Sequence, residues 1–144
     1  KAQVNRIIHA LHDVDAQFVE SRHDLAFMHI NRRCTKRSLI IHITNILDDV
    51  NAKQIQRYLH ILSKRHLALL TLLRDPDCFE LLQGPIQDTK SFYQAGAAAH
   101  LVNWRKAVLE RVSNSGILTL DCAGPELTAK MISEYLMIKA RNQL

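Results

Sequence analysis

Oxygen-bearing side chains cluster where three apolar stretches of this chain end. They are Thr44, Asn45, Asp48 and Asp49 after the first stretch, Asp75 and Asp77 after the second, and Asp121 and Glu126 after the third. Carboxylate, amide and hydroxyl oxygens are the ligands that hard divalent cations take. This composition predicts either a divalent-cation site or a partner-binding edge. The competing interpretation is that each acid caps the helix that follows it, and Pro76 and Pro125 at first-turn positions favour that interpretation.

The three apolar stretches predict the strands that would position these oxygens. They are residues 39–44, 67–73 and 117–121, and the first two are apolar on both faces, which is typical of strands covered by helices on two sides. Helical patterns separate the stretches, and such alternation indicates parallel strands. We therefore predict an α/β fold, with an open parallel sheet of about three strands and helices on both faces. The loops after the strands should emerge together at one edge.

The helices are predicted from apolar positions spaced three and four residues apart. The first carries Val4, Ile7, Ile8, Leu11 and Val14, and a second is expected from about Asp15 to Arg33 with Phe18 among its apolar residues. It stays open whether Glu20-Ser21 interrupts this second helix, with Ser21 as the N-cap of a new helix that begins near Arg22. A third runs from about 51 to 64. A long helix from about 89 to 113 is expected to end at Gly116, a residue suited to a left-handed C-cap. A last helix is expected to open at Pro125.

Composition and length fit one α/β domain over residues 1–144. The chain opens in a helical pattern without Met, which we interpret as a piece of a longer protein. Three dispersed cysteines (Cys34, Cys78 and Cys122) are typical of reduced thiols, so we expect a cytoplasmic setting. No apolar run reaches the length of a membrane span.

The net charge is +5, and the basic residues are scattered except for the cluster Arg32–Arg37. That cluster permits weak binding of anions or nucleic acid, but no stacking aromatic side chains accompany it. We therefore interpret it as a solvated turn and do not expect nucleic acid to be the main partner.

Histidines offer a second kind of metal ligand. His9 and His12 are three residues apart, and His23 and His29 lie on the following helix, but such spacings also occur on ordinary helix surfaces. His42, inside the first strand, is expected to be a hydrogen-bonded core residue. Trp104 is expected to belong to the core. No cofactor is predicted, and Mg²⁺ stays a weak alternative.

Three strands make a narrow sheet, and the first has no predicted neighbour on its outer side. Either further strands lie upstream of Lys1 or another molecule fills this edge. If the chain folds alone, we expect a homodimer through the edge 39–44 or through the helices beside it.

Three markers in the second half of the chain resemble a known family. They are Arg65-His66-Leu67 before a strand that ends Leu73-Arg74-Asp75-Pro76, the long helix that closes at Asn114-Ser115-Gly116 before Ile117–Asp121, and the ending Glu134-Tyr135-Leu136-x-x-Lys139-Ala140-Arg141. Together with residues 20–47 they resemble bacterial, uncharacterised von Willebrand factor A-like proteins that are usually encoded beside MoxR-type AAA+ ATPases.

The resemblance implies the C-terminal half of a von Willebrand A-like sheet. The strand with the metal motif Asp-x-Ser-x-Ser would precede Lys1, as would the membrane-anchoring helices that family members usually carry. The remaining metal positions map to Ser21 and Asn45, with Asp48 nearby, and a neutral amide at 45 makes this a degenerate site because Mg²⁺ prefers carboxylates.

These observations favour a non-enzymatic interaction or assembly domain, for which the resemblance supplies a MoxR-type ATPase or its client as partner. Two alternatives stay open: a metal-dependent hydrolase that uses the acidic edge, and a weak anion or nucleic-acid binder through Arg32–Arg37.

Overall fold

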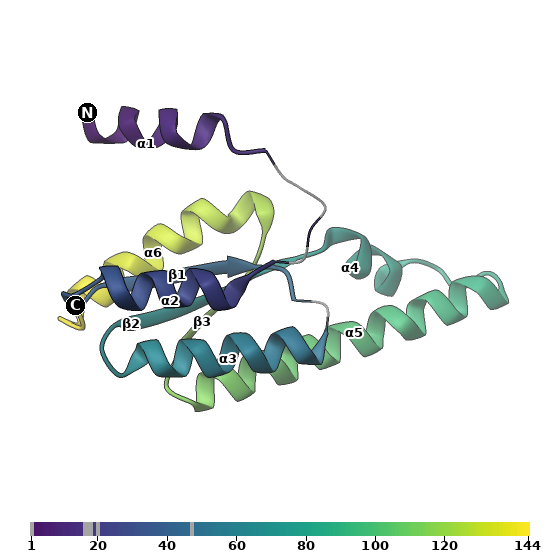
Figure 1. The fold of residues 1–144 in the computed structure, drawn as a ribbon. Helices are drawn as coiled ribbons and strands as arrows, with labels where there is room; N and C mark the ends of the chain where they lie inside the picture. Colours follow the sequence, from purple (N-terminus) through teal and green to yellow (C-terminus); the bar gives the residue numbers. More distant parts are fainter. Residues whose placement is uncertain (1, 16–18, 20, 47) are drawn as a thin grey trace.

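The computed structural model describes residues 2–15, 19, 21–46 and 48–144. Its elements are α1 (Ala2–His12), α2 (His23–Arg33), β1 (Leu39–Thr44), α3 (Asp49–Ser63), β2 (Leu67–Arg74), α4 (Pro76–Gln83), α5 (Thr89–Asn114), β3 (Leu118–Ala123), the 3-10 turn η1 (Gly124–Glu126) and α6 (Leu127–Ala140). The predicted α/β fold with an open parallel sheet is confirmed, and its arrangement is Rossmann-like (Figure 1).

The strands lie in the order β1-β2-β3, and β2 in the middle is the most deeply buried. One face of the sheet packs against α2, α3 and α5, which contribute Phe27, Leu59 and Val108 to the main core. Helix α6 lies on the other face, over β3 (Figure 1). The sheet therefore has helices on both faces, as predicted, but three of the four face one side.

The prediction that residues 39–44 are covered on both faces is wrong. Ile40 packs against the main core, whereas Ile41 and Ile43 on the opposite face are exposed. The reason is position: β1 is an outer strand, and α6 does not extend over it. Only β2 has the burial expected of a central strand.

Of the two alternatives for residues 15–33, a new helix that begins near Arg22 is confirmed, and an uninterrupted helix from Asp15 is not. Helix α2 begins at His23, and Ser21 and Arg22 before it are not helical. Arg22 forms two hydrogen bonds to Asp24, of 2.9 and 2.8 Å, in the first turn, and these hold the start of the helix there. Three residues named in the sequence analysis or within its segment 20–47 lie outside the described residues: Phe18, Glu20 and Leu47.

The apolar face predicted for the first helix exists but is not covered. Every residue of α1 is exposed, including Val4, Ile7, Ile8 and Leu11. In Figure 1 this helix stands apart from the sheet, on the side that carries α6. An amphipathic helix normally buries its apolar stripe, and α1 has nothing packed on that stripe in the described part of the chain.

The long helix was predicted closely: α5 ends at Asn114, and Gly116 follows with φ +81°, in the left-handed region. The third strand is shifted from 117–121 to Leu118–Ala123, because Cys122 and Ala123 still pair with β2. The last helix does not open at Pro125. That residue lies in η1, and α6 begins at Leu127.

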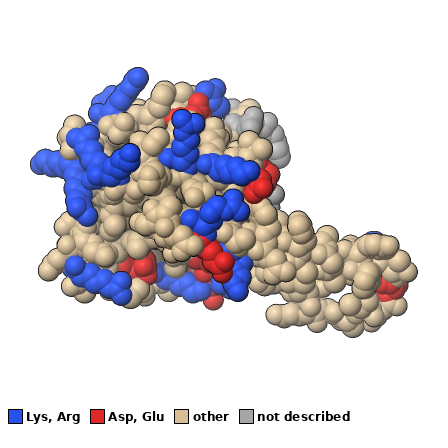
Figure 2. Space-filling view, turned by 90° about the horizontal axis from the view of Figure 1, so that it is seen from below, with Lys and Arg blue, Asp and Glu red and all other residues tan. Residues whose placement is uncertain are grey.

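Helix α4 and the start of α5 form a hairpin that projects from the sheet. We call residues 76–97 the arm; it is the extension at the right of Figure 2 and shows few charged side chains there, whereas Lys and Arg gather on the rest of this face. No helix in the described ranges is both long and apolar enough to cross a membrane.

Candidate functional site

Three predicted site residues come together at the end of β1. Ser21, Asn45 and Asp48 line one hollow of about 290 Å³, and Thr44 lies beside them. They meet because Thr44 ends β1, Asp48 is the N-cap of α3, and Ser21 lies just before α2. Asn45 and Asp48 are three residues apart in the chain, and the fold brings the distant Ser21, which the resemblance had pointed to, to the same hollow.

Among the described residues, Asp48 is the only carboxylate that lines this hollow, and both of its oxygens accept hydrogen bonds at the start of α3. Oδ1 accepts a hydrogen bond from the backbone N–H of Asn51, and Oδ2 accepts one from Asn51 Nδ2, both at 2.8 Å. The backbone hydrogen bond from Asn51 is the main reason that the pKa of Asp48 lies below its usual value. A single carboxylate so engaged, beside a neutral amide and hydroxyls, does not fit the ligand set of Mg²⁺.

Asp49 belongs to a different contact. The indole Nε1–H of Trp104 donates to Asp49 Oδ1 at 2.8 Å, which ties α5 to the first turn of α3. Trp104 is partly buried and packs against the main core, so the core interpretation of this residue is confirmed.

Asp75 and Asp77 start α4. The backbone N–H of Asp77 donates to Asp75 Oδ1 at 3.1 Å, and Pro76 follows the cap at a first-turn position. The capping interpretation of Asp75 is therefore confirmed. Asp77 lies on the arm and lines a hollow there.

Asp121 is the centre of an ion cluster that the sequence did not predict. Its Oδ1 accepts a hydrogen bond from Arg105 Nη2 at 2.9 Å, and its Oδ2 lies 3.2 Å from Arg74 Nε. The Arg105 side chain is only 9% exposed. A signal existed: Arg105 lies three and seven residues before Val108 and Val112, which places it on the buried face of α5.

Glu126 closes the turn after β3. Its Oε2 accepts hydrogen bonds from Lys130 Nζ at 2.8 Å and from the Ala123 N–H at 3.2 Å. The hydrogen bond from Lys130 is the largest cause of the lowered pKa of this carboxyl. Like Asp48 and Asp121, Glu126 has a structural contact that explains its position.

His42 differs from the prediction of a hydrogen-bonded core residue. Its Nε2 is buried and has no hydrogen-bond partner among the described residues, and its ring contacts the rings of His23 and Phe27 at 5.2 Å between centroids. Burial, with a smaller contribution from His23, lowers its pKa to about 4. The ring is therefore neutral near pH 7.

The other histidines and the basic cluster give no ligand set. His9 and His12 lie on the exposed α1, and within the described ranges no three His, Cys, Asp or Glu side chains form a group that could hold a metal ion. In the cluster Arg32–Arg37, Arg37 donates to the carbonyl of Gln143 at 3.0 Å.

The arm is the feature that sequence reasoning missed. Its exposed apolar side chains are Leu81, Leu82, Ile86, Phe92 and Tyr93. A signal was available, since Gly84-Pro85 is a strong helix breaker. It did not show that the helices on its two sides would leave the sheet and expose both aromatic rings.

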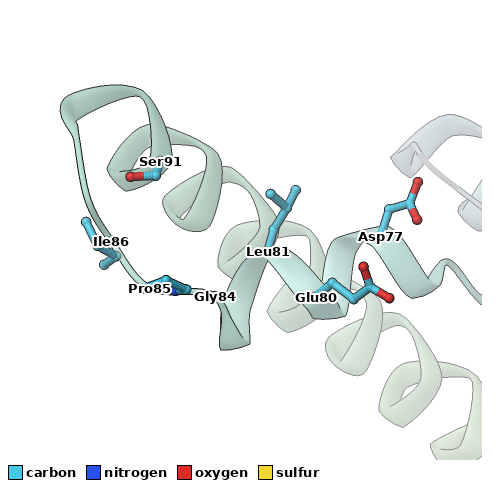
Figure 3. A pocket seen from close by; sticks show the side chains of 7 residues that line it. All are labelled: Asp77, Glu80, Leu81, Gly84, Pro85, Ile86 and Ser91. Atoms are coloured by element: carbon cyan, nitrogen blue, oxygen red, sulfur yellow. The ribbon is translucent and has the colours of Figure 1, made fainter.

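The arm also carries a hollow of about 330 Å³ between α4 and the start of α5 (Figure 3). Asp77 and Glu80 lie at the end near the sheet, and Pro85, Ile86 and Ser91 lie at the tip. A capping box fixes the tip, because Asp88 Oδ1 accepts from the Ser91 N–H while Ser91 Oγ accepts from the Asp88 N–H. The backbone hydrogen bond from Ser91 lowers the pKa of Asp88.

The resemblance to von Willebrand A-like proteins stays a prediction. Comparisons of this chain with protein-family models, with curated proteins and with solved structures gave no match.

Proposed function

We propose that this chain is a non-enzymatic interaction domain that binds a protein partner with its arm. The observation that carries the proposal is the exposure of large apolar side chains on a projecting hairpin: Phe92 is 61% exposed and Tyr93 is 70% exposed. Exposed apolar groups of this size, gathered on one projection, are typical of interaction sites. Aromatic side chains are also the commonest anchors of protein interfaces.

The charge of the arm indicates the chemistry of the partner. Residues 76–97 contain Asp77, Glu80 and Asp88 against Lys90, a net charge of −2 in a chain whose net charge is +5. The arm hollow places two carboxylates beside apolar side chains (Figure 3). A partner surface with Lys or Arg next to an apolar side chain would complement it.

The acids at the strand ends support an interaction function rather than a hydrolase. Asp48 and Asp75 cap helices, and Asp121 and Glu126 form ion pairs within the chain. Carboxylates held in this way keep loops in place. The same edge, with Thr44, Asn45, Asp49 and Asp77, extends from the arm toward β1 and would form the rim of the interface.

The resemblance supplies the candidate partner, a MoxR-type AAA+ ATPase of the kind encoded beside members of that family, or its client. The test is a binding measurement by biolayer interferometry with that ATPase immobilised. We expect the double variant Phe92→Ala/Tyr93→Ala to weaken binding at least tenfold. The control is Ile61→Ala near the C-terminal end of α3, a residue that is also exposed but lies away from the arm and its rim.

Binding that is unchanged in the arm variant, or weakened equally by Ile61→Ala, would contradict the proposed arm interface. Calorimetry distinguishes the alternative. Tight Mg²⁺ or Mn²⁺ binding that is lost in Asp75→Ala would favour a metal-dependent hydrolase.

A further inference from the structure

The backbone of β1 leaves hydrogen-bonding groups unpaired at the outer edge of the sheet. The Leu67 N–H donates to the Ser38 carbonyl at 3.0 Å, so the backbone groups of Ser38 point toward β2. Because these directions alternate along a strand, Ile40 and His42 also point toward β2, and Leu39, Ile41 and Ile43 point outward. In the described part of the chain, no strand lies on that outer side.

The side chains on this edge are apolar as well. Ile41 and Ile43 are 37% and 45% exposed, and they lie on the face where Leu69 and Thr71 are their neighbours in β2. The segment Leu39–Thr44 contains no Lys, Arg, Asp, Glu or Pro. Proteins that avoid edge-to-edge contact use those residues to block it, and β1 has none of them.

A second exposed apolar surface, on α1, lies on the same side of the sheet. The apolar stripe of α1 (Val4, Ile7, Ile8 and Leu11) is more than half exposed at each residue. Helix α1 is 11 residues long, or about 16 Å at the usual rise, and β1 is 6 residues long, or about 20 Å. A helix of this length can cover one strand of this length.

We propose that a second copy of this chain fills both surfaces. The two β1 strands pair across a two-fold axis and form a continuous six-stranded sheet, and α1 of each copy packs on Ile41 and Ile43 of the other copy. An isologous interface needs one patch that complements itself, and an uncharged open strand edge does so. The helix is needed too, because a stable interface buries about 1,200 Å² or more and two short strands alone bury less.

The outward backbone groups determine the direction and register of the pairing. Both copies present Leu39, Ile41 and Ile43, and in an antiparallel pair residues with outward groups stand directly opposite one another. The register that uses all three places Ile41 opposite Ile41 of the second copy, and Leu39 opposite Ile43. A shift by one residue would oppose outward and inward groups and would mix the two faces.

The test is sedimentation velocity of the 144-residue chain over a wide concentration range. We expect a dimer whose dissociation constant rises at least tenfold in Ile43→Lys, which puts a charge beside the axis. The matched control is Ile61→Lys on α3, where the wild-type residue is 46% exposed; it should leave the dimer intact. Circular dichroism checks that both variants are folded.

Two further variants separate the parts of the interface. Ile41→Pro removes an outward N–H without removing a hydrogen bond to β2, so it should weaken the dimer while leaving the subunit folded. Ile7→Glu should weaken it through α1. A wild-type chain that stays monomeric at high concentration overturns the proposal, and so does a dimer that Ile43→Lys and Ile41→Pro leave unchanged. Because this surface is separate from the arm, Phe92→Ala/Tyr93→Ala should not alter the dimer, and the two proposals fail independently.

Discussion

Replacing Asp121 with alanine is expected to lower the free energy of unfolding more than replacing any other acid at the strand ends. In the folded protein the Asp121 carboxylate lies between Arg105 and Arg74, at 2.9 and 3.2 Å. The Arg105 side chain is buried, so Asp121→Ala leaves an uncompensated charge inside the protein. Removing one partner of a buried ion pair costs about 3–5 kcal/mol, and we take about 3 kcal/mol because Asp121 is 29% exposed.

The two arginines should respond differently. The Arg74 side chain is more exposed than that of Arg105, at 36% against 9%, so Arg74→Ala should cost only about 1 kcal/mol. Arg105→Met removes the buried charge together with its desolvation cost and leaves Asp121 paired with Arg74, so it should also cost about 1 kcal/mol or less. The expected order of destabilisation is therefore Asp121→Ala well above both arginine variants, although all three break the same cluster.

Urea unfolding followed by circular dichroism measures these differences. With a slope of about 2 kcal/mol/M, a loss of 3 kcal/mol lowers the midpoint by about 1.5 M. Asp77→Ala, an acid on the exposed arm, is the control and should lie within about 0.5 kcal/mol of the wild type. A loss below about 1 kcal/mol for Asp121→Ala, or an equal loss for Arg105→Met, would refute the reasoning.

Three further predictions concern backbone conformation at glycine, the protonation of His42 and the binding of Mg²⁺. Gly116→Ala should destabilise by about 1 kcal/mol because φ is +81°, whereas Gly96→Ala inside α5 should stabilise by about 0.5–1 kcal/mol; thermal unfolding should show the opposite signs. His42 has a folded-state pKa of about 4, below its usual 6.5, so its contribution is complete above pH 6.5 and declines as the pH falls toward 4; His42→Phe should flatten that decline in urea titrations across this range. Mg²⁺ at millimolar concentration should leave the NMR signals of Asn45 and Asp48 unchanged. Shifts there that saturate with Mg²⁺ would contradict our conclusion that these residues do not suit Mg²⁺.

The sequence predicted most of the fold because its signals were local. Apolar runs identified all three strands, and Asp75-Pro76 and Gly116 marked helix ends through capping and left-handed backbone. The errors arose where contacts between distant parts of the chain decide the bounds or the burial of an element. The helical period of residues 15–33 left the start of α2 open, and the contacts of Arg22 with Asp24 place it at His23. Likewise, the composition of β1 does not reveal that α6 stops short of it.

The candidate site was predicted in part. The resemblance pointed to Ser21 and Asn45, whereas topology places Asn45 and Asp48 in the loop after β1, where they line one hollow with Ser21. What each acid does depends on its neighbours in space. Asp121 looks like Asp75 in the sequence, yet one pairs with arginines from β2 and α5 and the other caps a helix.

Helix α5 is anchored at one end only, and this has a consequence for its dynamics. Its second half contributes Arg105, Val108 and Val112 to the interior, while its first two turns lie in the exposed arm. The free energy of opening should therefore rise along a single helix. Amide protons near Phe92 should exchange with deuterium by local fraying, whereas those near Val112 should wait for global unfolding. Slowed exchange confined to the first turns of α5 would then report a bound partner, even one that leaves the global stability unchanged.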